Sequence, residues 1–179
     1  MRIISGSHKS RRINPPKNLP VRPTTDLAKE SLFNILANYF DLEGLSVLDL
    51  FAGTGNISYE FASRYTNEIT AVDLNFKCAS FIKSTALQMG FTNIKVIRRN
   101  VFDFLKKTNK TYDIIFADPP YDLDGIEKIP QLVFDNNLLN KDGWLIIEHS
   151  KETKLNNHPN FFQIRKYSKV NFSILTNET

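Results

Sequence analysis

The residues with the clearest chemical potential are Asp118-Pro119-Pro120-Tyr121, a carboxylate, two prolines and an aromatic ring in succession. They follow residues 112–117, an apolar run whose length and β-branched content are typical of a buried strand. The prolines fix φ and lack backbone N–H donors, so this turn can accept hydrogen bonds but can hardly donate them. Such a turn beside an aromatic ring suits a planar group that carries an NH2, which describes adenine, cytosine and guanine. For these four residues alone, an ordinary strand-to-loop turn stays open as the alternative.

A second motif lies upstream, in the run Asp49-Leu50-Phe51-Ala52-Gly53-Thr54-Gly55. Here a short apolar strand, predicted over residues 45–50, enters a glycine-bearing loop, and a predicted helix over residues 56–65 follows. Strand, Gly-x-Gly and helix in this order are typical of nucleotide-binding loops, because glycine lacks the Cβ that would keep a ligand away from the backbone. We interpret Asp49 as a cofactor residue, with a strand-end cap as the alternative, and expect Phe51 to contribute through its backbone.

An acid also follows the next predicted strand, since Asp73 lies 18 residues beyond Gly55. Such an acid commonly accepts hydrogen bonds from the ribose hydroxyls of a cofactor. The sequence has neither a Gly-x-x-x-x-Gly-Lys-Ser/Thr motif nor a complete Gly-x-Gly-x-x-Gly motif, so a phosphate cradle is poorly supported. We therefore expect a nucleoside ligand without a pyrophosphate.

Length and composition predict one domain, because 179 residues with 41% hydrophobic content can bury a single core but leave no room for a large second domain. No apolar run approaches the roughly 20 residues of a membrane helix, and the first residues lack the apolar region of a signal peptide, so we expect a cytoplasmic protein. Cys78 is the single cysteine, which excludes an intrachain disulfide, and the three histidines are scattered. We expect no metal.

The positive charge is concentrated at the beginning of the chain. The first 25 residues contain six basic side chains and no acid, although the whole chain carries a net charge of only +4. Four prolines in this segment resist helix formation and are expected to keep it extended. We predict a basic arm over residues 1–25 that contacts a polyanion, and one domain over residues 26–179. The candidate phosphate contacts are Arg11, Arg12, Lys17 and Arg22, while a merely soluble basic tail is the alternative.

Predicted strands and helices alternate along most of the chain, which indicates a parallel sheet with helices on both faces. The expected helices cover residues 26–40, 56–65, 75–89, 101–107 and 125–135, and the expected strands cover 45–50, 69–73, 94–98, 112–117 and 143–148. Two further strands, residues 161–167 and 170–175, are so close in sequence that they must pair as an antiparallel hairpin. Both motifs leave parallel strands at their carboxyl ends, where α/β sheets bind ligands, so we expect one site.

The motif order from Asp49 to Gly55, then Asp73, then Asp118 to Tyr121 resembles that of S-adenosylmethionine-dependent amino-group methyltransferases. Nearly the whole chain closely resembles the ribosomal small-subunit methyltransferase D family. This narrower likeness is carried by residues 1–6, 22–26, 30–36 and 147–149 and by the closing hairpin. It implies a Rossmann-like methyltransferase fold with a mostly parallel seven-stranded sheet, and methylation of the exocyclic N2 amine of a guanine in 16S ribosomal RNA.

The resemblance also implies roles for individual residues. Asp118, Pro119, Pro120 and Tyr121 would form the catalytic turn. The S-adenosylmethionine contacts would come from Asp49, Phe51, Gly53, Thr54, Gly55, Asp73, Leu74, Asn100 and Val101. The substrate would be 16S ribosomal RNA or the small ribosomal subunit, and we expect a monomer that needs no membrane and no obligate protein partner.

The sequence departs from the family pattern at two points in the expected site. Asn56-Ile57-Ser58 stands where a small residue, an apolar residue and glycine are usual. Asn100 stands where many related methyltransferases have an acid against the cofactor adenine, and its amide oxygen can accept the same hydrogen bond. Asp103 is the alternative acceptor.

Two other functions compete with this interpretation. An adenine-N6 methyltransferase acting on DNA or RNA can use a similar Asp-Pro-Pro-Tyr turn, but such DNA enzymes generally append a target-recognition region for which this chain has no room. RNA is therefore favoured. A non-catalytic RNA-binding scaffold is the second alternative, and the intact Asp118 and Gly53-Thr54-Gly55 argue against it.

Overall fold

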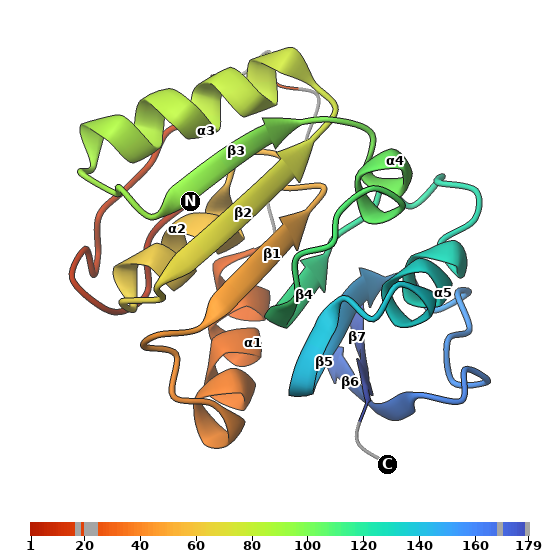
Figure 1. Cartoon of the computed structure of the whole chain (residues 1–179). Helices are drawn as coiled ribbons and strands as arrows, with labels where there is room; N and C mark the ends of the chain where they lie inside the picture. The colour runs from red at the N-terminus through yellow and green to blue at the C-terminus, as the bar shows by residue number, and fades with distance from the viewer. Residues whose placement is uncertain (17–18, 20–24, 168–169, 178–179) are drawn as a thin grey trace.

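The apolar runs of the sequence form the strands of one mixed sheet, in the order β3-β2-β1-β4-β5-β7-β6 (Figure 1). The computed structural model describes residues 1–16, 19, 25–167 and 170–177. The strands are β1 (Ser46–Leu50), β2 (Glu68–Asp73), β3 (Ile94–Arg98), β4 (Tyr112–Ala117), β5 (Leu139–His149), β6 (Phe161–Tyr167) and β7 (Val170–Thr176). The first five pair in parallel, and β7 pairs antiparallel with both β5 and β6. The predicted parallel sheet and its closing hairpin are confirmed.

Helices cover both faces of the sheet, as the alternation predicts. They are α1 (Asp26–Tyr39), α2 (Asn56–Ser63), α3 (Phe76–Gln88), α4 (Val101–Leu105) and α5 (Lys128–Asp135). Buried side chains of α4 and α5 share one hydrophobic cluster with one face of the sheet, whereas those of α1, α2 and α3 belong to two clusters on the other face. No helix of the described part is both long and apolar enough to cross a membrane.

One strand extends further than its sequence pattern indicates. β5 begins at Leu139 and not at residue 143, because its pairing with β4 continues through an irregularity in register. Asp142 has a φ of 61° at this irregularity, and the backbone of Gly143 lies so close to the carbonyl oxygen of Asp113 that an added Cβ would be 2.9 Å away. The residues before position 143 are mostly polar, so the hydrophobic pattern of the sequence does not predict this first part of the strand.

The beginning of the chain is not extended, which corrects the prediction. Residues 1–13 turn back on themselves: the Ile3 N–H donates to the Arg11 carbonyl oxygen at 3.0 Å. Ile3 and Ile13 are buried in a cluster with Tyr59. Burying a large aliphatic side chain stabilises a fold by about 1.5 to 3 kcal/mol, and the prolines come only after this segment, so they cannot oppose the turn.

A buried ion pair attaches this N-terminal loop to two helices. Lys29 Nζ of α1 lies 3.3 Å from Glu60 Oε2 of α2, and neither side chain is exposed. The same Nζ donates to the Arg2 carbonyl oxygen at 2.6 Å and to Asn56 Oδ1 at 2.8 Å, while Glu60 accepts the Ile4 N–H at 2.8 Å. The loop, α1 and α2 are therefore joined beside the start of α2.

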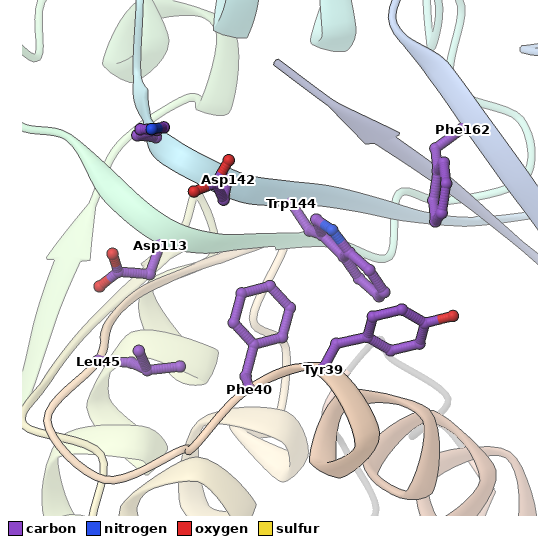
Figure 2. Close-up of a pocket in the computed structure, with 9 residues that line it drawn as sticks. Tyr39, Phe40, Leu45, Asp113, Asp142, Trp144 and Phe162 are labelled. Carbon is purple, nitrogen blue, oxygen red and sulfur yellow. The ribbon is translucent and has the colours of Figure 1, made fainter. Parts of the chain in front are cut away.

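An aromatic cluster fixes the other end of α1. The Trp144 ring of β5 lies 4.6 Å from Tyr39, 5.1 Å from Phe40 and 5.9 Å from Phe162, measured between ring centroids (Figure 2). These residues line a cavity of about 380 Å³ toward the amino ends of β4 and β5. This cavity lies at the opposite end of the sheet from the two motifs.

Candidate active site

The two motifs lie side by side at one edge of the sheet. β1 and β4 are neighbouring parallel strands (Figure 1). Their register pairs Leu50 with Ala117 at the carboxyl ends. Directly beyond this pair, the Asp118 N–H donates to the Leu50 carbonyl oxygen at 3.4 Å. The juxtaposition expected from the sequence is thus observed, and a ligand on one loop can touch a ligand on the other.

A cleft of about 1270 Å³ opens between the motifs. Its volume exceeds the usual 300 to 1,000 Å³ of a small-molecule pocket, so it can hold a nucleoside and a second planar group. The candidate residues that line it are Asp49, Phe51, Gly53, Thr54, Asp73, Leu74, Asn100, Val101, Asp118, Pro119, Pro120 and Tyr121. Further lining residues that the sequence analysis missed are Thr25, Leu27, Ala28, Ser31, Asn75, Phe76, Arg98, Phe102, Phe116, Leu123, Glu148, Ser150, Tyr167 and Val170.

The glycine-bearing loop holds its backbone in the left-handed region at three positions. Phe51 has a φ of 59°, Gly53 of 54° and Gly55 of 77°. Such a φ is uncommon in a non-glycine residue, and the strain at Phe51 is typical of loops that approach a ligand. Gly55 does not line the cleft; a Cβ there would lie 2.8 Å from the Tyr59 ring. Gly55 thus lets Tyr59 pack behind the loop.

Asp73 is held at the end of β2 by two backbone donors. Its Oδ2 accepts the Gly53 N–H at 2.8 Å, and its Oδ1 accepts the Asn75 N–H at 2.7 Å. These bonds fix the carboxylate next to the glycine-bearing loop, and each oxygen retains acceptor capacity. The arrangement fits the predicted ribose contact.

Asp49 is a buried carboxyl group under the same loop. The Ser58 hydroxyl of α2 donates to Asp49 Oδ2, at the position where the family usually has glycine. Burial raises the pKa of Asp49 to about 7, the hydrogen bond from Ser58 opposes this rise, and the nearby charge of Asp118 adds to it. The unusual residues 56–58 are visible in the sequence, but this contact is not, because it depends on how α2 packs against β1.

Asn100 caps α4 with the oxygen that was expected to face adenine. Its Oδ1 accepts the Phe102 N–H at 2.9 Å and the Asp103 N–H at 3.2 Å. Asp103 is exposed and does not line the cleft. The contact between Asn100 and the cofactor stays a prediction, and the cap itself keeps Val101 and Phe102 at the cleft wall.

The proline turn forms the middle of the cleft. Pro119 is buried, whereas Tyr121 is 63% exposed and therefore presents its ring at the mouth. The Leu123 N–H donates to the Pro120 carbonyl oxygen at 3.0 Å, which closes the turn. The geometry fits a rigid acceptor site beside an aromatic surface.

The candidate phosphate contacts lie outside this cleft. Arg11 and Arg12 are exposed on the N-terminal loop, where Arg12 forms an isolated antiparallel bridge with Arg2. Lys17 and Arg22 fall outside the described residues. Contact between this basic loop and RNA stays a prediction.

Comparison with known proteins identifies the family. The family model described as "Conserved hypothetical protein 95" matches residues 1–177. The chain is 34% identical over 181 residues to the Ribosomal RNA small subunit methyltransferase D of Buchnera aphidicola subsp. Baizongia pistaciae, covering 99% of this chain and 92% of that protein. The chain belongs to this family. A family member of the same name from Escherichia coli K12 is 30% identical over 155 residues, which cover 87% of this chain and 77% of that protein.

Solved structures agree with the fold. A putative methyltransferase, yhhF from Escherichia coli, superposes with a TM-score of 0.85 at 27% identity, covering 97% of this chain and 96% of that one. The Rossmann-like methyltransferase fold implied by the family resemblance is thereby confirmed, including the seven strands and the antiparallel hairpin.

Proposed function

We propose that this protein transfers a methyl group from S-adenosylmethionine to the exocyclic N2 amine of a guanine in 16S ribosomal RNA. The observation that carries the proposal is the direct link between the motifs, in which the Asp118 N–H donates to the Leu50 carbonyl oxygen at 3.4 Å. This link brings an amine-accepting turn against a nucleoside-binding loop. Membership of a family whose relatives are named ribosomal RNA small subunit methyltransferase D supports the same reaction.

The residues of the loop fit S-adenosylmethionine, a nucleoside with a cationic sulfonium and no phosphate. Asp73 is oriented for the ribose hydroxyls by the N–H groups of Gly53 and Asn75. Asp49 lies buried under this loop, and a bound cation nearby would stabilise the ionised form of its carboxyl group. When bound, S-adenosylmethionine supplies an electrophilic methyl group.

An aromatic amine is a poor nucleophile, because its lone pair is delocalised into the ring. The proline turn can counteract this delocalisation. The Asp118 carboxylate and the Pro119 carbonyl oxygen would accept the two hydrogens of the amine and draw the nitrogen toward tetrahedral geometry. Tyr121 would stack on the base and hold it flat. Fixing both reactants in line can lower the barrier by up to about 7 to 11 kcal/mol.

The methyl transfer needs no reactant other than S-adenosylmethionine and the guanine. A bond forms between the guanine nitrogen and the methyl carbon, the carbon–sulfur bond breaks, and its electron pair returns to sulfur. The nitrogen then releases one proton to Asp118 or to water. The substrate would be 16S ribosomal RNA or the small subunit, bound in the cytoplasm by a monomer, with Arg11 and Arg12 as candidate phosphate contacts.

The test is incubation with methyl-labelled cofactor and undermodified 16S RNA or small subunits, followed by mapping of the modified nucleotide by mass spectrometry. The proposal expects label on the N2 amine of one guanine. Label on adenine in DNA would favour the adenine-N6 alternative. Cofactor binding without label on any nucleic acid would favour the non-catalytic scaffold.

A further inference from the structure

The cleft continues beyond the proline turn, away from the glycine-bearing loop. This second part, the distal half of the cleft, lies between α1, the end of β5 and the closing hairpin. Its lining residues are Thr25, Leu27, Ala28, Ser31, Phe116, Glu148, Ser150, Tyr167 and Val170. Among these described residues Glu148 alone carries a carboxylate. The target base, reaching the turn from the side opposite the cofactor, would occupy this half.

Strand register brings Glu148 next to Asp118. Phe116 pairs with Ile146, and Ala117 with Ile147, so continuing the register by one residue sets Asp118 beside Glu148. Neighbouring strands lie about 4.8 Å apart, so the two acids border the same small volume. The adjacent acids thus form one edge that an amine-bearing base must meet.

Side-chain alternation gives the direction of Glu148. Successive residues of a strand point to opposite faces, so Glu148 shares a face with Trp144 and Ile146. Those two residues pack with Phe116 and with α1. The Glu148 side chain therefore lies on the α1 side of the sheet, where it is 4% exposed and forms part of the wall of the distal half.

We propose that Glu148 selects guanine by accepting the hydrogen on its ring nitrogen N1. This inference rests on the proposed function. In guanine the amine at C2 stands beside N1–H, so the edge carries adjacent donors. In adenine and cytosine the amine stands beside a ring nitrogen that has a lone pair, which a carboxylate repels. A carboxylate has about four acceptor positions, so Glu148 can take N1–H in addition to its contacts within the protein.

The size of the selection follows from hydrogen bonding to a charged acceptor. Such a bond contributes enough to change an equilibrium by about 10- to 100-fold, and losing it while the acceptor stays buried has an effect of similar size. Asp118 and Pro119 bind the amine that all three bases can offer, so they discriminate little. Glu148 would read the neighbouring ring position that distinguishes the bases.

The experiment uses two RNA substrates that differ at one base. Once the modified guanine is mapped, a second RNA is made with 2-aminopurine there, which keeps the C2 amine but has a lone pair at N1. Wild-type protein should methylate the guanine RNA with a kcat/KM about 10- to 100-fold higher. In Glu148→Gln the amide NH2 can donate to N1 of 2-aminopurine, so this preference should fall to near one or reverse. S-adenosylmethionine affinity should not change.

Two further variants sharpen the readout. Glu152→Gln removes the same charge from an exposed position four residues further along the chain and should keep the wild-type preference. Glu148→Asp retains an acceptor and should keep a preference for guanine at reduced rate. The ratio of the two kcat/KM values does not depend on the fraction of folded enzyme, so partial unfolding of a variant cannot produce the result.

Two results would overturn the inference, and they are distinguishable. If Glu148→Gln keeps the full preference for guanine, Glu148 is structural, while the proposed function survives through the guanine methylation seen with wild-type protein. If wild-type protein binds S-adenosylmethionine but methylates no guanine RNA, the proposed function fails and the selection of guanine fails with it.

Discussion

Lys29 Nζ lies 3.3 Å from Glu60 Oε2, and both side chains are completely withdrawn from solvent. This pair holds the N-terminal loop, because Lys29 also donates to the Arg2 carbonyl oxygen and Glu60 accepts the Ile4 N–H. It also borders the site, because Lys29 donates to Asn56, which lines the cleft. Breaking the pair should therefore disturb stability first and cofactor binding second.

Lys29→Met should lower the free energy of unfolding by about 3 kcal/mol, the low end for breaking a buried ion pair. It removes one of the two cations beside Glu60 and the donor to the Arg2 carbonyl oxygen, while Arg64 stays 3.0 Å from Glu60 Oε1. Urea denaturation monitored by circular dichroism measures this change. Lys83→Met is the matched control on an exposed face of α3, and it should change stability by no more than about 0.5 kcal/mol. Equal small effects of both substitutions would show that the buried pair contributes little.

Asp49 should make the stability of the cofactor-free protein fall as pH rises. Its pKa is raised from 3.8 to about 7 in the fold, so between about pH 4 and 7 the folded state binds a proton that the unfolded chain releases. The slope is at most about 1.4 kcal/mol per pH unit. Residue 49 cannot titrate in the Asp49→Asn variant. The free energy of unfolding of this variant, minus that of wild type, should therefore increase from pH 5 to pH 8. A constant difference in urea denaturation across this range would contradict the raised pKa.

Asp118→Ala should reduce kcat by about 100-fold or more while leaving S-adenosylmethionine affinity near normal, because it removes an acceptor for the amine but keeps the backbone N–H that bonds Leu50. Single-turnover methylation and calorimetric cofactor binding separate the two effects. Asp118→Asn, which retains one acceptor oxygen, should lose less. Parallel loss of turnover and affinity in the alanine variant would mean that the residue mainly holds the fold.

Neutralising Arg11 and Arg12 together should weaken RNA binding and flatten its dependence on salt. Each phosphate contact contributes roughly 0.7 to 0.9 to the slope of log K against log salt, so two lost contacts should reduce the slope by about 1.5. Filter binding at several salt concentrations gives the slope. Lys106 and Lys107, an adjacent exposed pair beside α4, provide the control. If both double variants have the wild-type slope, the N-terminal loop is not in the RNA interface.

Gly55→Ala should destabilise the protein more than Gly44→Ala does. Both glycines have a positive φ, 77° and 84°, so each alanine introduces backbone strain of about 1 to 2 kcal/mol. At Gly44 nothing lies within 4 Å of the new Cβ, whereas at Gly55 it meets the Tyr59 ring at 2.8 Å. The difference between the two melting temperatures measures the clash. Equal shifts would mean that the Tyr59 ring moves aside freely.

Local sequence order predicts the parts of this site that lie at strand ends. Asp73 and Asp118 directly follow apolar runs, so their position at the carboxyl edge follows from the strand pattern alone. The contact between Ser58 and Asp49 could not be foreseen in this way, because it depends on how a helix packs on its strand. The contact of Gly55 with the cofactor stays a prediction, and its packing against Tyr59 was not foreseen from the motif.

Long-range contacts explain the other differences. Lys29 and Glu60 each look like surface residues of an amphipathic helix, and only the folded N-terminal loop shows that they are buried. The same loop was expected to be extended because of its positive charge and its prolines. Two of its isoleucines, Ile3 and Ile13, favour the folded form, in which both are buried. Glu148 belongs to a predicted strand, but its position beside Asp118 appears only when β4 and β5 are paired.

The strand order has a consequence for biosynthesis. β7, which is furthest along the chain among the described strands, lies inside the sheet, between β5 and β6. Until it has left the ribosome, the edge of β5 has no strand to pair with, and an open edge is a template for association with other chains. Premature termination before β7 would therefore remove a wall of the distal half and leave the edge of β5 unpaired. Such truncated chains should aggregate, so cellular quality control should remove them before their lack of catalysis has any effect.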